Sequence, residues 1–201
     1  MHINWLINVK QFSEKSTNSG RAPHALMLVG VPGIGKRSAA VWLARKRLEL
    51  PVDAFPVYPL NVPHHADLHW VRPAEGRKTI SIDQIRGLVS ELSLTSYEGV
   101  GKVAVVEPAE VMTINAANSL LKTLEEPAGD TLIILVVDKH GSLPATIYSR
   151  CQRLKLTVPR EEEALAWLKE VDSRVEWPSI LRAAGGAPLA AIGALEQAVQ
   201  A

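Results

Sequence analysis

The stretch that decides the fold is Gly30-Val31-Pro32-Gly33-Ile34-Gly35-Lys36-Arg37-Ser38. The apolar run 25–29 (ALMLV) precedes it, and the helix-forming run 39–44 (AAVWLA) follows it. A short apolar run predicts a buried strand, and residues rich in alanine and leucine predict a helix. The segment therefore predicts a strand, a glycine-rich loop and a helix in direct succession.

The loop has the spacing of a phosphate-binding loop. Gly30, Gly35 and Lys36 occupy the fixed positions of the GxxxxGK pattern, and Gly33 lies between them. Glycines let backbone N–H groups converge on phosphate oxygens, and the lysine reaches the outer phosphates. The candidate nucleotide-contacting residues are therefore Gly30, Gly33, Gly35, Lys36, Arg37 and Ser38.

The last position of the motif departs from the pattern. A Ser or Thr hydroxyl should follow the lysine and bind Mg²⁺, but Arg37 stands there. Ser38 comes one residue late, which is about 100° further round a helix. The sequence thus predicts the fold of a phosphate loop and leaves open whether the loop handles ATP.

Apolar runs and helical periodicity alternate along the chain up to Pro159. We expect strands at 25–29, 68–71, 103–106, 131–137 and 153–158, with helices at 36–48, 82–92, 113–126 and 144–149. In the helix at 113–126, the side chains that should face inward are Ile114, Ala117, Leu120, Leu121 and Leu124. Alternation of this kind predicts an α/β fold with a five-stranded parallel sheet.

Residues 160–201 have a different pattern. They contain three helical segments, 161–171, 178–184 and 189–200, a Gly185-Gly186 break and no strand signal. We therefore divide the chain into a core, residues 1–159, and a small all-α lid domain, residues 160–201.

The ends of two predicted strands carry charged residues that should face any nucleotide. Ligands in such sheets lie beyond the carboxyl ends of the strands. Glu107 follows the third strand, where phosphate-loop ATPases place the acidic residues that hold Mg²⁺, but Pro108 takes the second acidic position. Asp138-Lys139-His140 follow the fourth strand.

Composition limits the class of protein. Lys and Arg number 22 and Asp and Glu 21, a net charge of +1, so no global basic field favours direct DNA binding. The single cysteine, Cys151, excludes an internal disulfide. No apolar run approaches the roughly 18 residues of a membrane helix. We expect a cytoplasmic protein with no membrane contact.

Four potential metal ligands, His64, His65, Asp67 and His69, lie near a proline-rich segment. They have no accompanying cysteines and no second ligand pair on a defined element. We interpret the histidines as surface-loop residues and expect no metal site.

The combined motifs resemble those of one family. Strands alternating with helices, a phosphate loop after the first strand and a helical appendage resemble an AAA+ core with its lid. Within that class, His24-Ala25-Leu26, the string Asn118-Ser119-Leu120-Leu121-Lys122-Thr123-Leu124-Glu125-Glu126-Pro127 and Ser149-Arg150-Cys151 resemble bacterial clamp-loader subunits of DNA polymerase III. The resemblance covers essentially the whole chain.

The departures indicate which branch of the family is most similar. Motor subunits, gamma or tau, have an intact loop, an Asp-Glu pair after the third strand, four zinc-binding cysteines and a lid arginine. This chain has Lys36-Arg37, Glu107-Pro108, one cysteine and Gly185-Gly186-Ala187-Pro188 instead. That pattern is similar to delta-prime subunits, which are thought to lack useful ATPase activity. The missing cysteines also depart from many delta-prime sequences, so no zinc site carries over.

The resemblance implies a role within an assembly. The chain would join gamma or tau and delta subunits in the DNA polymerase III holoenzyme, a DNA-directed DNA polymerase, and help load the sliding clamp on primed DNA. Arg150 would act as an arginine finger in trans, a role that needs no nucleotide on its own subunit. ATP or ADP bound at this chain's own loop would not be hydrolysed.

Two alternatives remain at this point. The chain could be an active AAA+ ATPase that uses Lys36 with Ser38 or Glu107 for the metal, or a scaffold whose loop is only a structural turn. Subunits of this type continue into a helical collar domain, whereas this sequence stops after the lid at Ala201. We expect the two-domain fragment alone to be monomeric.

Overall fold

In a computed structural model of the chain, residues 1–18, 23–52, 55–139 and 141–200 are described. They form one five-stranded sheet, with strand order β2-β3-β4-β1-β5 and every neighbouring pair parallel. The strands are β1 (Ala25–Val29), β2 (Leu68–Val71), β3 (Lys102–Val106), β4 (Thr131–Val137) and β5 (Gln152–Lys155). The predicted α/β fold is confirmed.

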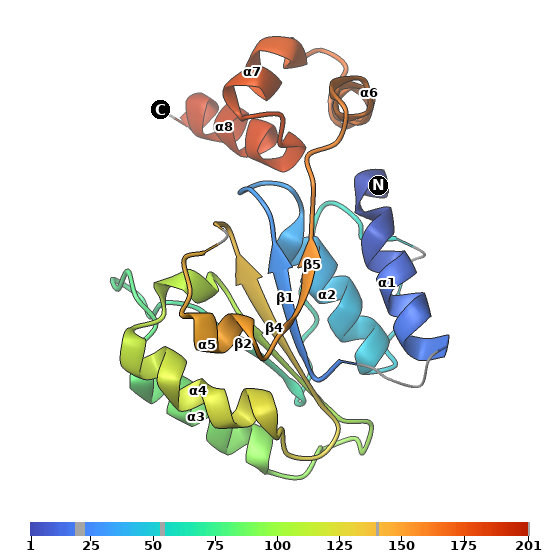
Figure 1. The fold of residues 1–201 in the computed structure, drawn as a ribbon. Helices are drawn as coiled ribbons and strands as arrows, with labels where there is room; N and C mark the ends of the chain where they lie inside the picture. The colour runs from blue at the N-terminus through green and yellow to red at the C-terminus, as the bar shows by residue number, and fades with distance from the viewer. Residues whose placement is uncertain (19–22, 53–54, 140, 201) are drawn as a thin grey trace.

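Helices cover both faces of the sheet. On one face lie α1 (Ile7–Asn18), which follows the 3-10 turn η1 (Asn4–Leu6), and α2 (Lys36–Arg47). On the other lie α3 (Ile82–Ser93) and α4 (Ile114–Glu125), with the 3-10 turn η2 (Ala109–Val111) and the short α5 (Ala145–Tyr148) nearby (Figure 1).

The strand side chains divide between two apolar clusters. Leu26 and Leu28 of β1 pack in the cluster under α2, whereas Met27 packs in the cluster under α3 and α4. Successive side chains of a strand point to opposite faces, so a strand covered on both sides must be apolar throughout. This requirement explains why β1, β3 and β4 read as continuous apolar runs.

Local signals fix where two of the helices begin. Ser81 and Gln84 form a capping box at the start of α3, because each side chain binds the other residue's backbone N–H. At α4, the Thr113 hydroxyl accepts from the N–H of Ala116.

Two details of the sequence prediction are wrong. The fifth strand ends at Lys155 instead of Val158, because it is an edge strand that pairs with β1, and β1 ends at Val29, the partner of Lys155. Ile114 was expected to face inward but is 73% exposed. It is the first residue of α4, and this end of the helix extends away from the strands (Figure 1).

The histidine-rich segment is less exposed than expected. His64 is exposed, but the side chain of His65 is only 6% exposed and His69 is partly buried, so the surface-loop interpretation is wrong for these two. Asp67 lies between them and is 2% exposed: its N–H donates to His65 Nδ1 (3.1 Å), and its carboxylate accepts from Tyr97 N (2.8 Å), Glu98 N (3.0 Å) and Ser96 Oγ (3.0 Å). Among the described residues no three His, Cys, Asp or Glu side chains form a group that could hold a metal.

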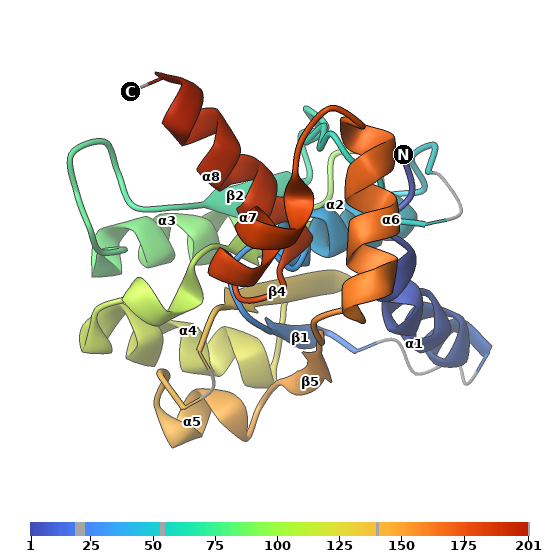
Figure 2. The same cartoon turned by 90° about the horizontal axis from the view of Figure 1, so that it is seen from above.

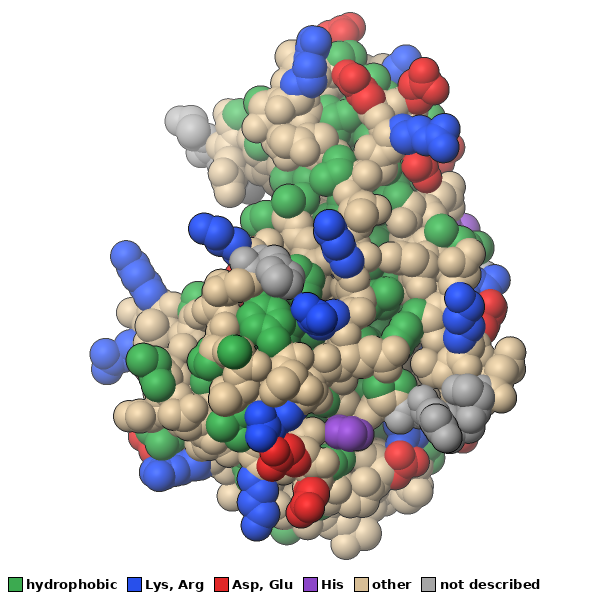
Figure 3. Space-filling view, viewed as in Figure 1, with side chains coloured by type: hydrophobic (Ala, Val, Ile, Leu, Met, Phe, Trp, Pro, Cys, Tyr) green, Lys and Arg blue, Asp and Glu red, His purple; other side chains and the backbone are tan. Residues whose placement is uncertain are grey.

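The C-terminal part is helical, with α6 (Glu161–Val171), α7 (Trp177–Ala183) and α8 (Pro188–Gln200). These helices lie above the carboxyl ends of the strands (Figures 1 and 2). Acidic and basic side chains are mixed on their outer surface (Figure 3). Over the described ranges, no helix is both long and apolar enough to span a membrane. The lid helices thus close over the edge of the sheet where the phosphate loop lies.

Candidate functional site

The phosphate loop joins β1 to α2 and lies directly under the lid. Gly33 and Gly35 have φ angles of +74° and +99°, which only glycine adopts easily. A Cβ on Gly33 would lie 2.3 Å from the backbone nitrogen of Ala190 in α8, and the N–H of Leu189 donates to Gly33 O at 3.0 Å. The loop glycines here allow close packing of the lid on the loop.

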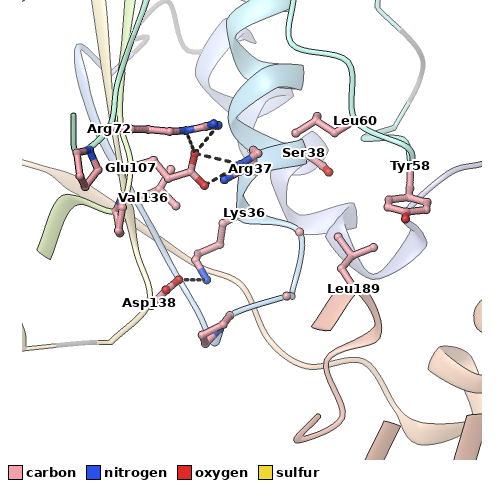
Figure 4. A pocket seen from close by; sticks show the side chains of 15 residues that line it. Lys36, Arg37, Ser38, Tyr58, Leu60, Arg72, Glu107, Val136, Asp138 and Leu189 are labelled. Atoms are coloured by element: carbon pink, nitrogen blue, oxygen red, sulfur yellow. Dashed lines mark hydrogen bonds and ion pairs between the residues drawn. The ribbon is translucent and has the colours of Figure 1, made fainter. Parts of the chain in front are cut away.

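Lys36 is fully engaged inside the loop. Its ammonium nitrogen lies 2.5 Å from Gly30 O, 2.7 Å from Val31 O and 2.7 Å from Asp138 Oδ1 (Figure 4). A lysine ammonium has three N–H donors, and all three have acceptors here. The side chain is 5% exposed. A phosphate group would have to displace these partners before Lys36 could bind it.

Arg37 and Glu107 form the second part of the site. Arg37 Nε donates to Glu107 Oε1 at 2.8 Å, and Arg72 Nη2 lies 3.0 Å from Glu107 Oε2. Trp70 Nε1 also donates to Oε2 at 3.0 Å, and the Glu107 side chain is 12% exposed. Both oxygens of the carboxylate are therefore bound to N–H donors (Figure 4).

This arrangement does not fit a bound Mg²⁺. The hydroxyl expected beside the lysine is replaced by the Arg37 guanidinium. Of the two acidic groups that line the cavity, Glu107 is paired with two guanidinium groups and Asp138 with the Lys36 ammonium. A divalent cation requires free oxygen ligands. Ser38 is buried and lines the same cavity of about 450 Å³, beside Lys36, Arg37 and Glu107. The loop retains its shape and its lysine but not its metal ligands.

Aromatic residues attach the lid to the core. Trp5 Nε1 donates to Ile34 O of the loop (2.9 Å), and Trp167 Nε1 of α6 donates to His2 O (2.8 Å). The Trp167 ring packs edge-on against Trp5 and Tyr58, with centroids 5.0 and 5.7 Å away. Burial, with a smaller effect of the nearby Glu196 carboxylate, raises the pKa of Tyr58. Since one cluster joins the N-terminus, the loop and α6, the lid is held in place.

Arg150 lies elsewhere, between α5 and β5, and is not among the residues that line the Lys36 cavity. Its Nε donates to Glu125 Oε1 at 2.6 Å, and its Nη1 donates to Thr146 O at 2.9 Å and to Ser149 Oγ at 3.2 Å. The Arg150 side chain is 30% exposed and that of Glu125 48% exposed. Next to it, burial raises the pKa of the Cys151 thiol to about 11, so this thiol stays protonated near neutral pH.

The structure therefore brings most predicted site residues together and leaves one apart. Gly33, Gly35, Lys36, Arg37, Ser38 and Glu107 line one cavity, with Asp138 from the end of β4. Gly30 does not line it, but its carbonyl accepts a hydrogen bond from Lys36. His140, also predicted to face a nucleotide, lies outside the described residues. Sequence reasoning missed Arg72 and Trp70; their contact with Glu107 depends on β2 pairing with β3, and the sequence does not specify strand order.

Comparison with known proteins identifies the family. A family model described as "DNA polymerase III, delta subunit" matches residues 7–160. The chain belongs to the DNA polymerase III delta' family. It is 39% identical to "DNA polymerase III subunit delta'" of Pseudomonas aeruginosa over 86% of this chain and 56% of that protein. The corresponding protein of Haemophilus influenzae is 36% identical, over 96% of this chain and 61% of the relative. The chain thus spans less than two thirds of these relatives.

Solved structures agree on the fold. A gamma subunit-related DNA polymerase III protein of Thermotoga maritima is 28% identical, with a TM-score of 0.61, over 86% of this chain and 52% of that one. The RuvB Holliday junction branch migration motor of Thermotoga maritima is 15% identical, with a TM-score of 0.62, over 94% of this chain and 58% of the RuvB chain. At that identity the similarity supports the AAA+ fold alone.

Proposed function

We propose that this chain is the part of a clamp-loader delta' subunit that completes a neighbour's ATPase site without hydrolysing ATP itself. The single observation that carries the proposal is the pairing of Arg37 and Arg72 with Glu107. A phosphate loop whose metal position holds a guanidinium lacks the cation that bridges and neutralises phosphate oxygens. The proposal rests on family membership together with this geometry.

At the chain's own loop, nucleotide binding and ATP hydrolysis are separate questions. Lys36 would have to exchange two backbone carbonyls and Asp138 for phosphate oxygens, so any nucleotide binds in competition with the loop's own structure. Pro108, at the second acidic position, offers no carboxylate to polarise water. ATP or ADP bound here would therefore not be turned over.

Arg150 is the residue that we expect to act on a neighbour. An arginine finger stabilises charge on the transferring phosphoryl group and contributes a factor of roughly 10³–10⁵ in rate. Arg150 is partly exposed and lies away from its own chain's loop, as a residue acting in trans must. The expected partners are the gamma or tau and delta subunits and the sliding clamp, with primed DNA contacted through the assembly.

The test is ATP hydrolysis by a loader assembled with the full-length protein, stimulated by clamp and primed DNA. Arg150→Ala should abolish hydrolysis at the one site that Arg150 completes, and leave assembly intact. Unchanged stimulated hydrolysis in a fully assembled Arg150→Ala loader would contradict the proposal.

The competing function is an active ATPase that uses Lys36 with Ser38 or Glu107. The burial of Ser38 in the cavity is the one observation in its favour. It requires Glu107 to release two guanidinium groups and the indole N–H of Trp70 before it can bind a metal. Mg²⁺-dependent hydrolysis by the purified chain, abolished by Lys36→Ala, would establish it.

A further inference from the structure

Glu125 is the direct partner of Arg150, and the two residues come from different elements. Glu125 is the last residue of α4, and Arg150 follows α5, 25 positions later in the sequence. One oxygen of the Glu125 carboxylate, Oε1, contacts both Nε and Nη2 of the guanidinium. It therefore holds the Nε–Nη2 edge of the guanidinium through charge-assisted hydrogen bonding.

The position of Glu125 is unfavourable for the helix by itself. Carbonyl groups at a helix C-terminus give that end a partial negative charge, and a carboxylate there adds to it. Lys122 is the only basic residue in the last turn of α4. Arg150 supplies the missing positive charge from outside the helix, so the pair accounts for a glutamate at this position.

The guanidinium is also held from its other side. Nη1 donates to Thr146 O in α5 and to the Oγ of Ser149, the residue that follows this helix. Glu125 and the end of α5 thus fix the plane of a side chain that remains partly exposed. Arginine normally has many rotamers, and most of that freedom has already been lost before any partner arrives.

We propose that Glu125 is a positioning residue that holds Arg150 ready for a phosphate of the neighbouring subunit. This inference rests on the proposed function, because it assigns a role to Glu125 only if Arg150 acts in trans. Fixing a long side chain in advance avoids an ordering cost that corresponds to about a two- to ten-fold change in rate. Glu125 does not itself touch the reacting atoms.

The experiment compares five variants of the full-length protein in the reconstituted loader: Glu125→Ala, Glu125→Gln, Glu126→Ala, Arg150→Ala and the double variant Glu125→Ala/Arg150→Ala. Glu126 is the adjacent exposed carboxylate and serves as the matched control. Stimulated ATP hydrolysis is measured for each loader, and the thermal midpoint of each purified variant is measured by circular dichroism.

Glu125→Ala should lower the stimulated rate about two- to ten-fold, while Glu126→Ala leaves it unchanged. Glu125→Gln keeps an oxygen acceptor for Nε and should restore part of the loss. The double variant should be no slower than Arg150→Ala alone, because residues acting as a unit are non-additive. The thermal midpoints should stay together, since exposed ion pairs contribute little stability.

Three results would overturn the inference. A loader with Glu125→Ala that hydrolyses ATP at the wild-type rate, while Arg150→Ala is impaired, would leave the proposed function standing and remove Glu125 from it. A double variant slower than Arg150→Ala, with a lowered thermal midpoint, would make the role of Glu125 merely structural. If Arg150→Ala has no effect, the proposed function and this inference both fail.

Discussion

Positively charged side chains have opposite surroundings in the cavity at the phosphate loop and on the surface around Arg150. Lys36 is buried and has three acceptors, all from its own chain, and Glu107 beside it is bound by two guanidinium groups and an indole. Arg150 is partly exposed and has one carboxylate partner that is itself half-exposed. A closed network resists exchange with a ligand, whereas a partly exposed guanidinium whose plane is already fixed can also contact an anion from outside the chain. Under the proposed function, we therefore expect Arg150 to act on a neighbouring subunit and the chain's own loop to be inert.

The largest effect should come from a conservative change at the exposed arginine. Arg150→Lys keeps the charge but loses the planar fork that contacts Glu125, Thr146 and Ser149 together. We expect most of the roughly 10³-fold contribution of an arginine finger to be lost at the completed site. The loss of rate is measured by single-turnover ATP hydrolysis in the assembled loader. Full activity with lysine would mean that charge alone suffices and that the fixed geometry has no role.

The next effect concerns the cluster that holds the lid over the closed cavity. Trp167→Ala removes a ring that packs on Trp5 and Tyr58 and a bond to His2 O. The expected loss is about 3–5 kcal/mol in the free energy of unfolding, from the cavity and the lost packing. Urea denaturation of the chain measures it. Trp167→Phe is the matched control, because it keeps an aromatic ring without the N–H; equal stability of all three proteins would contradict a fixed lid.

Asp67 is a buried carboxylate away from both sites. It tests whether a carboxylate whose oxygens accept several hydrogen bonds stabilises the fold. Burial raises the pKa of Asp67, but bonds from the N–H groups of Tyr97 and Glu98 and from the Ser96 hydroxyl outweigh it, so the pKa lies below its ordinary value. A carboxyl with a lowered folded-state pKa contributes stability above its unfolded pKa near 3.9 and loses it as pH falls through the folded value.

Asp67→Asn should therefore cost about 1–3 kcal/mol at pH 7, because one amide cannot accept all three bonds. Its stability should also depend less on pH than that of the wild type below about pH 4. Urea denaturation between pH 3 and pH 7 measures both effects, since these values bracket the carboxyl titration. Parallel pH profiles for the two proteins would show that Asp67 is not held in its charged form.

The smallest effect should come from restoring the consensus hydroxyl in the closed cavity. In Arg37→Thr, Glu107 still binds Arg72 and Trp70, and Pro108 still replaces the second acid. We expect hydrolysis by the purified chain to stay within about two-fold of background, because one hydroxyl does not rebuild a metal site. Mg²⁺-dependent turnover in this variant would show that Arg37 alone blocks the site.

Sequence reasoning located β1 and β4 to the residue, because strands buried on both faces need a continuous apolar run. It also located β2, a half-buried edge strand. It overestimated β5, because the strand ends where its partner β1 ends, and the sequence does not specify which strand is the partner. It also placed Ile114 inward, because helical periodicity does not reveal where a helix extends past the sheet.

The candidate site was predictable in its members but not in its contacts. The loop spacing identified Lys36 and Arg37 as neighbours of a possible nucleotide, and the position after a predicted strand identified Glu107 and Asp138. The partners that close the cavity, Asp138 and Arg72, follow strands whose order in the sheet no local pattern specifies. The contact between Glu125 and Arg150 is equally non-local, since it requires α4 and the turn after α5 to meet.

The most direct test of the account compares Lys36→Ala and Arg150→Ala in the same reconstituted loader, with ATP hydrolysis stimulated by clamp and primed DNA. The account predicts that Lys36→Ala keeps the wild-type rate within about two-fold and that Arg150→Ala removes the contribution of one site. A loss of hydrolysis with Lys36→Ala and none with Arg150→Ala would contradict it, and would show that the closed loop is the working ATPase.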